Sequence, residues 1–203
     1  ASSGVQTDSR RVVGGEVFFA LRGENFDGNR YAERALEAGA VCAVVDNPEV
    51  AVDDRYVVVE DTLVALQELA HYHRTRLSMP IIAITGTNGK TTTKELVAAV
   101  LSRKGRTCYT QGNLNNHIGV PLTLLSIPND ADFAIVEMGA SAQGEIALLA
   151  RIAAPDYGVI TNIGKAHLEG FGGVEGIRKG KGELYDFLAQ SGGVAIYRSD
   201  DEV

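Results

Sequence analysis

The sequence contains few cysteines, few prolines and no tryptophan, and it has no excess of basic residues. Its two cysteines, Cys42 and Cys108, are too few for a disulfide scaffold; we expect reduced, buried side chains, with a bridge between them as the less favoured alternative. Lysine and arginine number 19 against 26 acidic residues, and the net charge of −7 argues against nonspecific nucleic-acid binding, which needs a dense basic face. No apolar run approaches the roughly 20 residues of a membrane span, and no signal-peptide pattern opens the chain. We therefore expect a cytoplasmic protein that binds neither nucleic acid nor a membrane.

What the sequence does contain is typical of a globular α/β protein. Hydrophobic residues make up 45% and charged residues 22% of the 203 positions, which is enough chain for one large domain or two modest ones. Residues 1–78 combine short apolar runs with helical stretches and predict a small mixed α/β domain. We interpret 77–80 as a linker. Residues 79–203 predict a mostly parallel sheet flanked by helices, because apolar strand candidates alternate there with helices.

The strands of the second domain are predicted at 81–85, 107–110, 133–137, 157–161 and 193–197. The helix after the first of these strands places four apolar side chains on one face, namely Leu96, Val97, Val100 and Leu101. The sequence stops shortly after the last predicted strand, at a point where a doubly wound sheet would normally continue. We therefore interpret 79–203 as an incomplete domain.

A glycine-rich segment follows the first of these strands and leads into a helix: Gly86-Thr87-Asn88-Gly89-Lys90-Thr91-Thr92-Thr93. Glycines let backbone N–H groups approach phosphate oxygens, and a helix presents its positive N-terminal end there. We expect Lys90 to contact the β- and γ-phosphates and the Thr91 hydroxyl to bind magnesium. The spacing G-x-x-G-K-T is shorter than the common G-x-x-x-x-G-K-[ST]. A turn without a ligand is the alternative.

Two further side chains are predicted at the same edge of the sheet. Glu137 ends the strand 133–137, and His167 follows the strand 157–161. The carboxyl ends of parallel strands form the ligand-binding edge of an α/β sheet, where a metal-binding carboxylate is commonly placed. The sequence therefore predicts Glu137 and His167 near Thr91 at a divalent metal site.

Several motifs resemble the Mur ligase family and occur in the family's order. In the second domain they are GTNGKTT at 86–92, NLNNHIGVP at 113–121, EMGA at 137–140, GEI at 144–146 and AHLE at 166–169. In the first domain they are TDSR at 7–10, FFAL at 18–21 and FDG at 26–28. The resemblance covers essentially the whole chain, and the asparagine run favours the MurF type over the MurE type.

The resemblance implies a monomeric, ATP-dependent amide ligase of peptidoglycan precursor synthesis. Such an enzyme has three domains: one for the UDP substrate, here 1–78, one for ATP, here 79–203, and a C-terminal domain absent from this chain. It implies that UDP-N-acetylmuramoyl-tripeptide and D-alanyl-D-alanine are joined through an acyl phosphate. Without the third domain we expect negligible activity, because the closed site cannot assemble.

The resemblance also assigns roles to individual residues. The residues with a catalytic role are Lys90, Lys181 and His167. Two magnesium ions are held by Thr91, Glu137, His167 and Lys181, of which Lys181 is carbamylated; the neighbouring Lys179 is the alternative. ATP is bound by Gly86, Thr87, Asn88, Gly89, Lys90, Thr91 and Thr92. Asn115 and Asn116 are expected to contact the nucleotide or the substrate carboxylate, with a role in a turn as the alternative. The UDP end is bound by Ser9, Arg10, Asp27 and Gly28.

Other functions stay open at this point. A MurE-type ligase would add the third amino acid of the peptide instead. A generic phosphate-loop switch or small kinase would need no second domain, although the Asn-Lys-x-Asp-like stretch of a guanine-specific switch is missing. A folylpolyglutamate synthetase has a similar loop but lacks the motifs at 7–10 and 26–28. In a fourth alternative, the first domain is a protein-binding scaffold.

Overall fold

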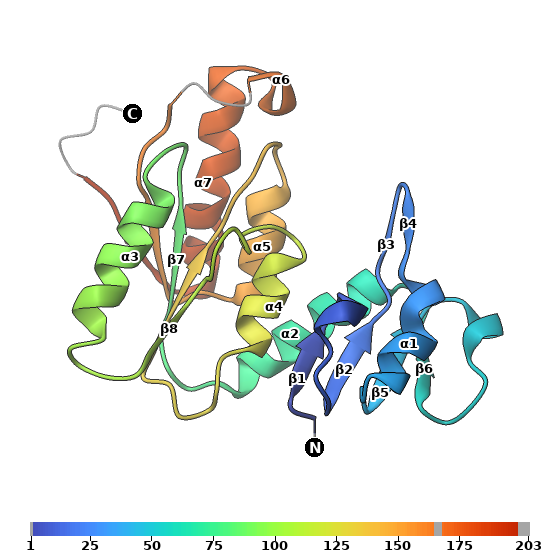
Figure 1. Ribbon diagram of the computed structural model, residues 1–203. Coiled ribbons are helices and arrows are strands. Elements are labelled where there is room, and N and C mark those ends of the chain that lie inside the picture. The colour runs from blue at the N-terminus through green and yellow to red at the C-terminus, as the bar shows by residue number, and fades with distance from the viewer. Residues whose placement is uncertain (1, 165–167, 199–203) are drawn as a thin grey trace. The chain divides into compact units, whose positions relative to one another are not determined.

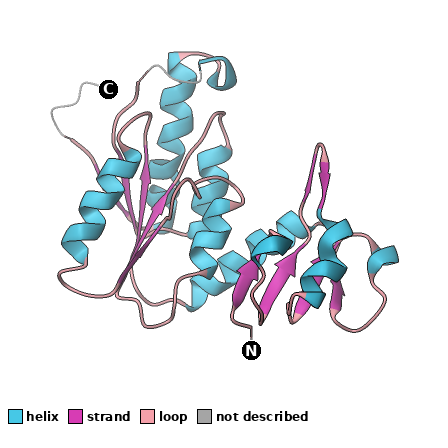
Figure 2. Ribbon diagram, viewed as in Figure 1, coloured by secondary structure: helices cyan, strands magenta, loops and turns pink. Residues whose placement is uncertain are grey.

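The computed structural model describes residues 2–164 and 168–198, without the side chain of residue 168. Two compact units divide the chain, Ala1–Leu69 and Ala70–Val203. Both units are built of parallel strands and helices (Figures 1 and 2). The mixed α/β class predicted from the sequence is confirmed. The division falls inside helix α2 (Thr62–Arg76), a few residues before the segment interpreted as a linker.

The first unit contains a four-stranded parallel sheet with the order β1-β2-β5-β6. Its strands are β1 (Gly4–Gln6), β2 (Glu16–Phe19), β5 (Cys42–Val45) and β6 (Tyr56–Val58). A hairpin of β3 (Arg22–Gly23) and β4 (Phe26–Asp27) follows β2. The short helices are η1 (Ser9–Arg11), η2 (Gly28–Tyr31), α1 (Ala32–Glu37) and η3 (Pro48–Val50).

The core of the first unit lies between this sheet and α1. Phe18 and Ala43 project from neighbouring strands and are almost fully buried against Ala32, Ala35 and Leu36 of the helix. Small alanines on the helix let it approach the sheet closely, and the apolar area removed from water stabilises the unit. The unit therefore has a core of its own.

The second unit contains a five-stranded parallel sheet with the order β11-β10-β7-β9-β8. Its strands are β7 (Ile81–Thr85), β8 (Thr107–Tyr109), β9 (Phe133–Glu137), β10 (Tyr157–Ile160) and β11 (Val194–Ile196). All five lie within a residue of the predicted ranges. The helices are α3 (Lys90–Leu101), α4 (Gly119–Leu125), α5 (Glu145–Ala153), α6 (Leu168–Phe171) and α7 (Val174–Ser191).

Helices cover both faces of this sheet (Figure 1). Alternate residues of the central strand β7 point to opposite faces, so that Ala83 packs in the cluster with α4, α5 and α7 while Ile84 packs with α3. Burial on both faces explains why the strands are apolar throughout. The carboxyl ends of β7, β9 and β10 consequently share one edge of the sheet.

The apolar face predicted for α3 is only half covered in the described residues. Leu96 and Val100 are 64% and 68% exposed, and the buried side of the helix is centred on Lys94 and Ala98. The Lys94 ammonium donates to Thr110 O at 2.7 Å and pairs with Glu95 at 3.0 Å. These partners satisfy a buried cation that apolar periodicity alone would place outside.

Candidate functional site: the phosphate loop and the strand ends beside it

The loop between β7 and α3 needs its two glycines. Gly86 has φ of +141°, and a Cβ there would lie 2.0 Å from Thr161 Oγ1. Gly89 has φ of +78° and forms the N-cap of α3. Both conformations are strained for residues with a side chain, so the loop can pass this close to the end of β10 only with glycine at Gly86.

Asn162, just after β10, fixes the middle of the loop. Its carbonyl oxygen accepts from Thr87 N at 3.0 Å. Its side-chain Oδ1 accepts from Asn88 N at 3.0 Å, and its Nδ2 donates to Asn88 O at 2.9 Å. The Thr161 hydroxyl donates to the same Asn88 carbonyl at 2.6 Å. The N–H groups of Thr87 and Asn88 are thus already bonded within the protein.

The groups left to bind an anion lie at the start of α3. The first N–H groups of a helix have no intrahelical partner, and in α3 these belong to Lys90, Thr91 and Thr92. The Lys90 ammonium folds back over the loop and donates to Gly86 O at 2.9 Å and Thr87 O at 3.3 Å. A cation and the positive end of a helix therefore meet at one point, which is an arrangement that binds phosphate.

Glu137 lies at the carboxyl end of β9 and is only 2% exposed. Its Oε1 accepts from Asn115 Nδ2 at 2.8 Å. Its Oε2 is buried and has no hydrogen-bond partner in the described part of the chain. A buried carboxylate oxygen without a partner is costly, and a bound cation or donor would relieve that cost.

Lys181 of α7 is buried, with 3% of its surface exposed. Its ammonium lies 3.4 Å from Ala140 O and 5.2 Å from the centre of the Phe171 ring. Burial, with a further contribution from the Lys90 charge, lowers the pKa of Lys181 to about 8, against the opposing effect of Glu145 and Glu183. A sizeable fraction of this amine is consequently neutral near physiological pH.

A cavity of about 580 Å³ lies beside the phosphate loop. It is lined by Lys90, Asn115, Asn116, His117, Gly139, Ala140, Ser141, Glu145, Leu148 and Leu149. The structure thus brings the loop lysine and both predicted asparagines to one cavity. Asn116 also has a local role, because its Oδ1 accepts from Ile118 N and Gly119 N at the start of α4.

Some predicted residues are not tested by this geometry. His167 lies outside the described residues. Thr91 is exposed in the first turn of α3. Within the described residues no group of three or more histidine, cysteine, aspartate and glutamate side chains could hold a metal ion.

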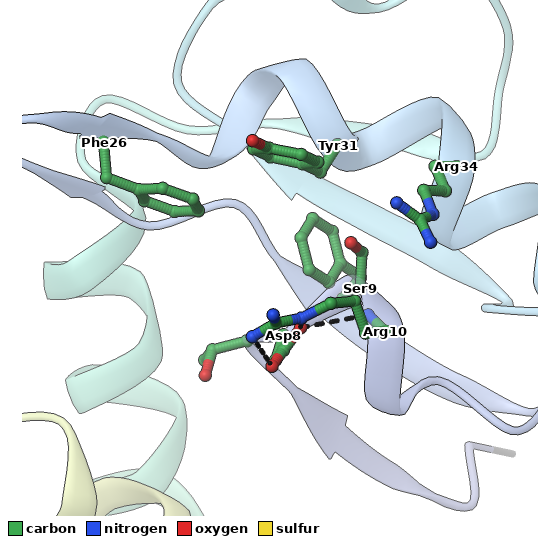
Figure 3. A pocket seen from close by; sticks show the side chains of 8 residues that line it. Asp8, Ser9, Arg10, Phe26, Tyr31 and Arg34 are labelled. Atoms are coloured by element: carbon green, nitrogen blue, oxygen red, sulfur yellow. Dashed lines mark hydrogen bonds and ion pairs between the residues drawn. The ribbon is translucent and has the colours of Figure 1, made fainter.

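A separate cavity of about 510 Å³ lies in the first unit (Figure 3). It is lined by Thr7, Asp8, Ser9, Arg10, Phe18, Phe26, Tyr31 and Arg34. Phe26 and Tyr31 stack with ring centroids 5.5 Å apart and an angle of 9° between their planes. The guanidinium groups of Arg10 and Arg34 line the same cavity (Figure 3). Aromatic surface next to arginine suits a flat, anionic ligand such as a nucleotide.

The four residues predicted for the UDP end are placed differently. Ser9 and Arg10 line this cavity, where Arg10 forms a two-pronged ion pair with Asp8 that lowers the pKa of Asp8 to about 2. Asp27 instead accepts from Asn29 at the start of η2. Gly28 is buried, and a Cβ there would lie 2.5 Å from Leu21 O. These last two residues make turn contacts.

Sequence reasoning overlooked several residues that the structure brings into these sites. Asn162 lies in the same segment after β10 as His167, but nothing in the sequence indicates its pairing with Asn88. Phe26 belongs to the motif at 26–28, but no motif indicates that Tyr31 and Arg34 line the same cavity. The described helices include none long and apolar enough to cross a membrane.

A glycine-rich loop at the switch from strand to helix, with a lysine and a buried carboxylate beside it, is typical of nucleotide-binding α/β proteins. Comparison with known proteins narrows this class. The family model described as "Mur ligase middle domain" matches residues 84–203, and "Mur ligase family, catalytic domain" matches residues 2–74. The chain therefore belongs to the Mur ligase family.

Similar proteins agree with this assignment. UDP-N-acetylmuramoyl-tripeptide–D-alanyl-D-alanine ligase of Bacillus subtilis (strain 168) is 45% identical over 98% of this chain and 44% of its own length. MurF from Acinetobacter baumannii superposes with a TM-score of 0.88 at 42% identity, over 98% of this chain and 44% of that one. MurF ligase from Thermotoga maritima in complex with ADP superposes with a TM-score of 0.83 at 36% identity, over 91% of this chain and 43% of that one. The chain thus spans less than half the length of these relatives.

Proposed function

We propose that the protein containing this chain is a MurF-type ligase, which joins D-alanyl-D-alanine to UDP-N-acetylmuramoyl-tripeptide at the expense of ATP. The observation that carries the proposal is the 45% identity to a ligase of that name over 98% of this chain. The phosphate loop supports it, because a loop of this kind before a helix N-terminus can bind the phosphates of ATP. The crystal structure of a 36% identical relative in complex with ADP supports an adenine nucleotide as the ligand of this loop.

In this proposal the start of α3 binds the triphosphate. The N–H groups of Lys90, Thr91 and Thr92 donate to phosphate oxygens. Asn162 stabilises the loop through its hydrogen bonds to the main chain of Asn88. The Lys90 ammonium leaves the carbonyl oxygens of its own loop and binds the β- and γ-phosphates. Phosphoryl transfer between two anions depends mainly on such charge neutralisation and positioning.

The residues present fit magnesium. The Oε2 of Glu137, which has no partner in the described part of the chain, supplies a hard oxygen ligand of the type that magnesium prefers. The exposed Thr91, which carries a hydroxyl, lies in the first turn of α3. His167 is proposed as a further ligand on the family resemblance. A magnesium ion held by these residues would supply positive charge to neutralise the reacting anions.

Lys181 is proposed to carry a carbamate. Its neutral amine attacks carbon dioxide, a C–N bond forms, and the released proton goes to water, which turns a cation into an anion. Burial beside Ala140, a residue of the cavity wall, makes a free amine available at this point. The anion would then serve as a ligand of the second metal.

The reaction then proceeds in two steps. The terminal carboxylate of the tripeptide attacks the γ-phosphorus of ATP, so that an acyl phosphate forms and ADP leaves. The amine of D-alanyl-D-alanine attacks the acyl carbon, the C–N bond forms, and phosphate leaves as the amine loses a proton. The UDP end of the substrate is assigned to the cavity of the first unit, where Ser9 and Arg10 lie.

The test is turnover of the intact protein that contains this chain. Incubated with ATP, magnesium, UDP-N-acetylmuramoyl-tripeptide and D-alanyl-D-alanine, it should release ADP and form the pentapeptide product, both measured by mass spectrometry. Product from UDP-N-acetylmuramoyl-dipeptide and a single amino acid would instead assign the MurE type. ATP hydrolysis that no acceptor stimulates would favour a generic nucleotide-binding protein.

A further inference from the structure

The contact between Asn115 and Glu137 is unusual because it uses only half of the carboxylate. Asn115 Nδ2 donates to Oε1 at 2.8 Å, whereas Oε2 is buried without a partner in the described part of the chain. Glu137 as a whole is 2% exposed. A buried carboxylate would ordinarily bond through both oxygens. One oxygen of Glu137 is therefore held by the protein, and the other is left for a ligand.

Asn115 is itself held rigidly. Its N–H donates to Asn113 O at 2.8 Å, and its carbonyl oxygen accepts from Gly139 N at 2.8 Å. A Cβ on Gly139 would lie 2.9 Å from Asn115 Oδ1, so glycine is needed for the loop to approach the end of β9 this closely. The main chain of Asn115 is thus fixed beside the end of β9, which places its side-chain amide within hydrogen-bond distance of Glu137.

The backbone of Glu137 is fixed from the other side. Glu137 N donates to Thr110 Oγ1 at 2.9 Å, and the carbonyl oxygen of Thr110 accepts from the buried Lys94 ammonium at 2.7 Å. The main chain and one carboxylate oxygen of Glu137 are therefore both positioned by neighbouring segments. A ligand group held in this way loses little conformational entropy when it binds a cation.

We propose that Asn115 is a positioning residue for a divalent cation: it holds Oε1 of Glu137 so that Oε2 remains free as the ligand. The inference rests on the proposed function, which supplies the metal. An amide suits this task because it orients the carboxylate without neutralising it, whereas lysine or arginine would cancel the charge that attracts the cation. In this role Asn115 acts through Glu137, and the inference replaces the direct nucleotide contact that the family resemblance implies for Asn115.

The test compares metal binding with nucleotide binding in the intact protein. Asn115→Leu keeps the approximate volume of the side chain and removes the donor; Asn115→Ala is the second variant. Mn²⁺ binding in the presence of ADP is followed by electron paramagnetic resonance, and ADP binding without metal by calorimetry. Both variants should bind Mn²⁺ about 10-fold more weakly or worse, as for other residues that orient metal ligands. Their metal-free ADP affinity should stay within about twofold of wild type.

Asn113→Ala is the matched control, because Asn113 lies on the same loop with an exposed side chain. It should bind Mn²⁺ as wild type does. Thermal melting checks that each variant is folded. The coupling is tested in a Glu137→Gln background, where adding Asn115→Leu should weaken Mn²⁺ binding no further.

Several results would overturn the inference. Additive losses in the double variant would mean that Asn115 acts independently of Glu137. Unchanged Mn²⁺ binding with weakened metal-free ADP binding would place Asn115 at the nucleotide. In both cases the proposed function survives. If the wild-type protein binds neither ADP nor Mn²⁺, the proposed function fails and the inference fails with it.

Discussion

Asn162 pairs with the main chain of Asn88 through both ends of its side-chain amide, with N–H···O distances of 3.0 and 2.9 Å. The pair joins the segment after β10 to the middle of the phosphate loop. The side-chain amide of Asn162 thus bonds to Asn88 as a neighbouring β-strand would, with one hydrogen bond donated and one accepted. The shape of the loop is therefore determined by a residue more than 70 positions away in the sequence.

Replacing Asn162 by alanine should weaken nucleotide binding. The change removes two hydrogen bonds, each with a net contribution of about 1 kcal/mol, so we expect ATP affinity to fall about 5- to 30-fold. The dissociation constant of a fluorescent ATP analogue is the measurement. Asn129→Ala, at an exposed turn asparagine, is the control and should not change it. Equal affinities in the two variants would show that the loop keeps its shape without the pair.

Lys90→Ala should abolish acyl phosphate formation without abolishing binding of the UDP substrate. We expect acyl phosphate formation in the intact protein to fall by about 100-fold or more, because a preorganised donor to the developing charge is lost. Binding of the UDP substrate, measured by calorimetry, should persist, because the cavity assigned to it lies in the other unit. Parallel loss of both properties would contradict this division of labour.

Lys181→Ala tests the carbamate. The variant should lose most ligase activity, and short-chain carboxylates such as acetate or propionate should restore part of it, because they return an anion to the space left by the side chain. Activity is measured against carboxylate concentration, with chloride at the same ionic strength as control. Absence of any rescue would favour a role for the plain ammonium.

Arg74→Ala should destabilise the second unit. Arg74 is 8% exposed, pairs with Asp156 at 2.8 Å and donates to Ala153 O and Ala154 O at the C-terminal end of α5. Asp156 is 46% exposed and can be solvated, so the main loss is that of the charged hydrogen bonds to the two carbonyl groups, which should lower the free energy of unfolding by about 2 kcal/mol, measured by urea denaturation. Arg76→Ala on the same helix is the control, because its guanidinium only lies over the Tyr72 ring. A loss of similar size in that control would mean that the buried contacts of Arg74 contribute little.

Much of the fold could be predicted from the sequence, because strands buried on both faces are apolar throughout and the glycine-rich loop marks the switch to a helix. The face of α3 could not be predicted in full. Apolar periodicity places Leu96 and Val100 inside, and it cannot reveal that Lys94 finds a carbonyl acceptor sixteen residues further on. That contact exists only once β8 lies beside α3.

The candidate site was predictable where a motif carries the chemistry, as at Lys90 and Glu137. The aromatic pair of the first unit was not, because Phe26 and Tyr31 meet only through the hairpin and η2 that follows it. Asp27 and Gly28, between them in sequence, are typical turn residues and make turn contacts. Whether either residue reaches the substrate stays a prediction.

The resting position of Lys90 bears on how the loop meets its ligand. The Lys90 ammonium donates to two carbonyl oxygens of its own turn and closes the loop on itself. A loop held in this way has little backbone freedom to lose when it binds an anion. In the proposed complex, the Lys90 ammonium would exchange these two carbonyl oxygens for phosphate oxygens, and rotation of the Lys90 side chain alone would be enough for that exchange.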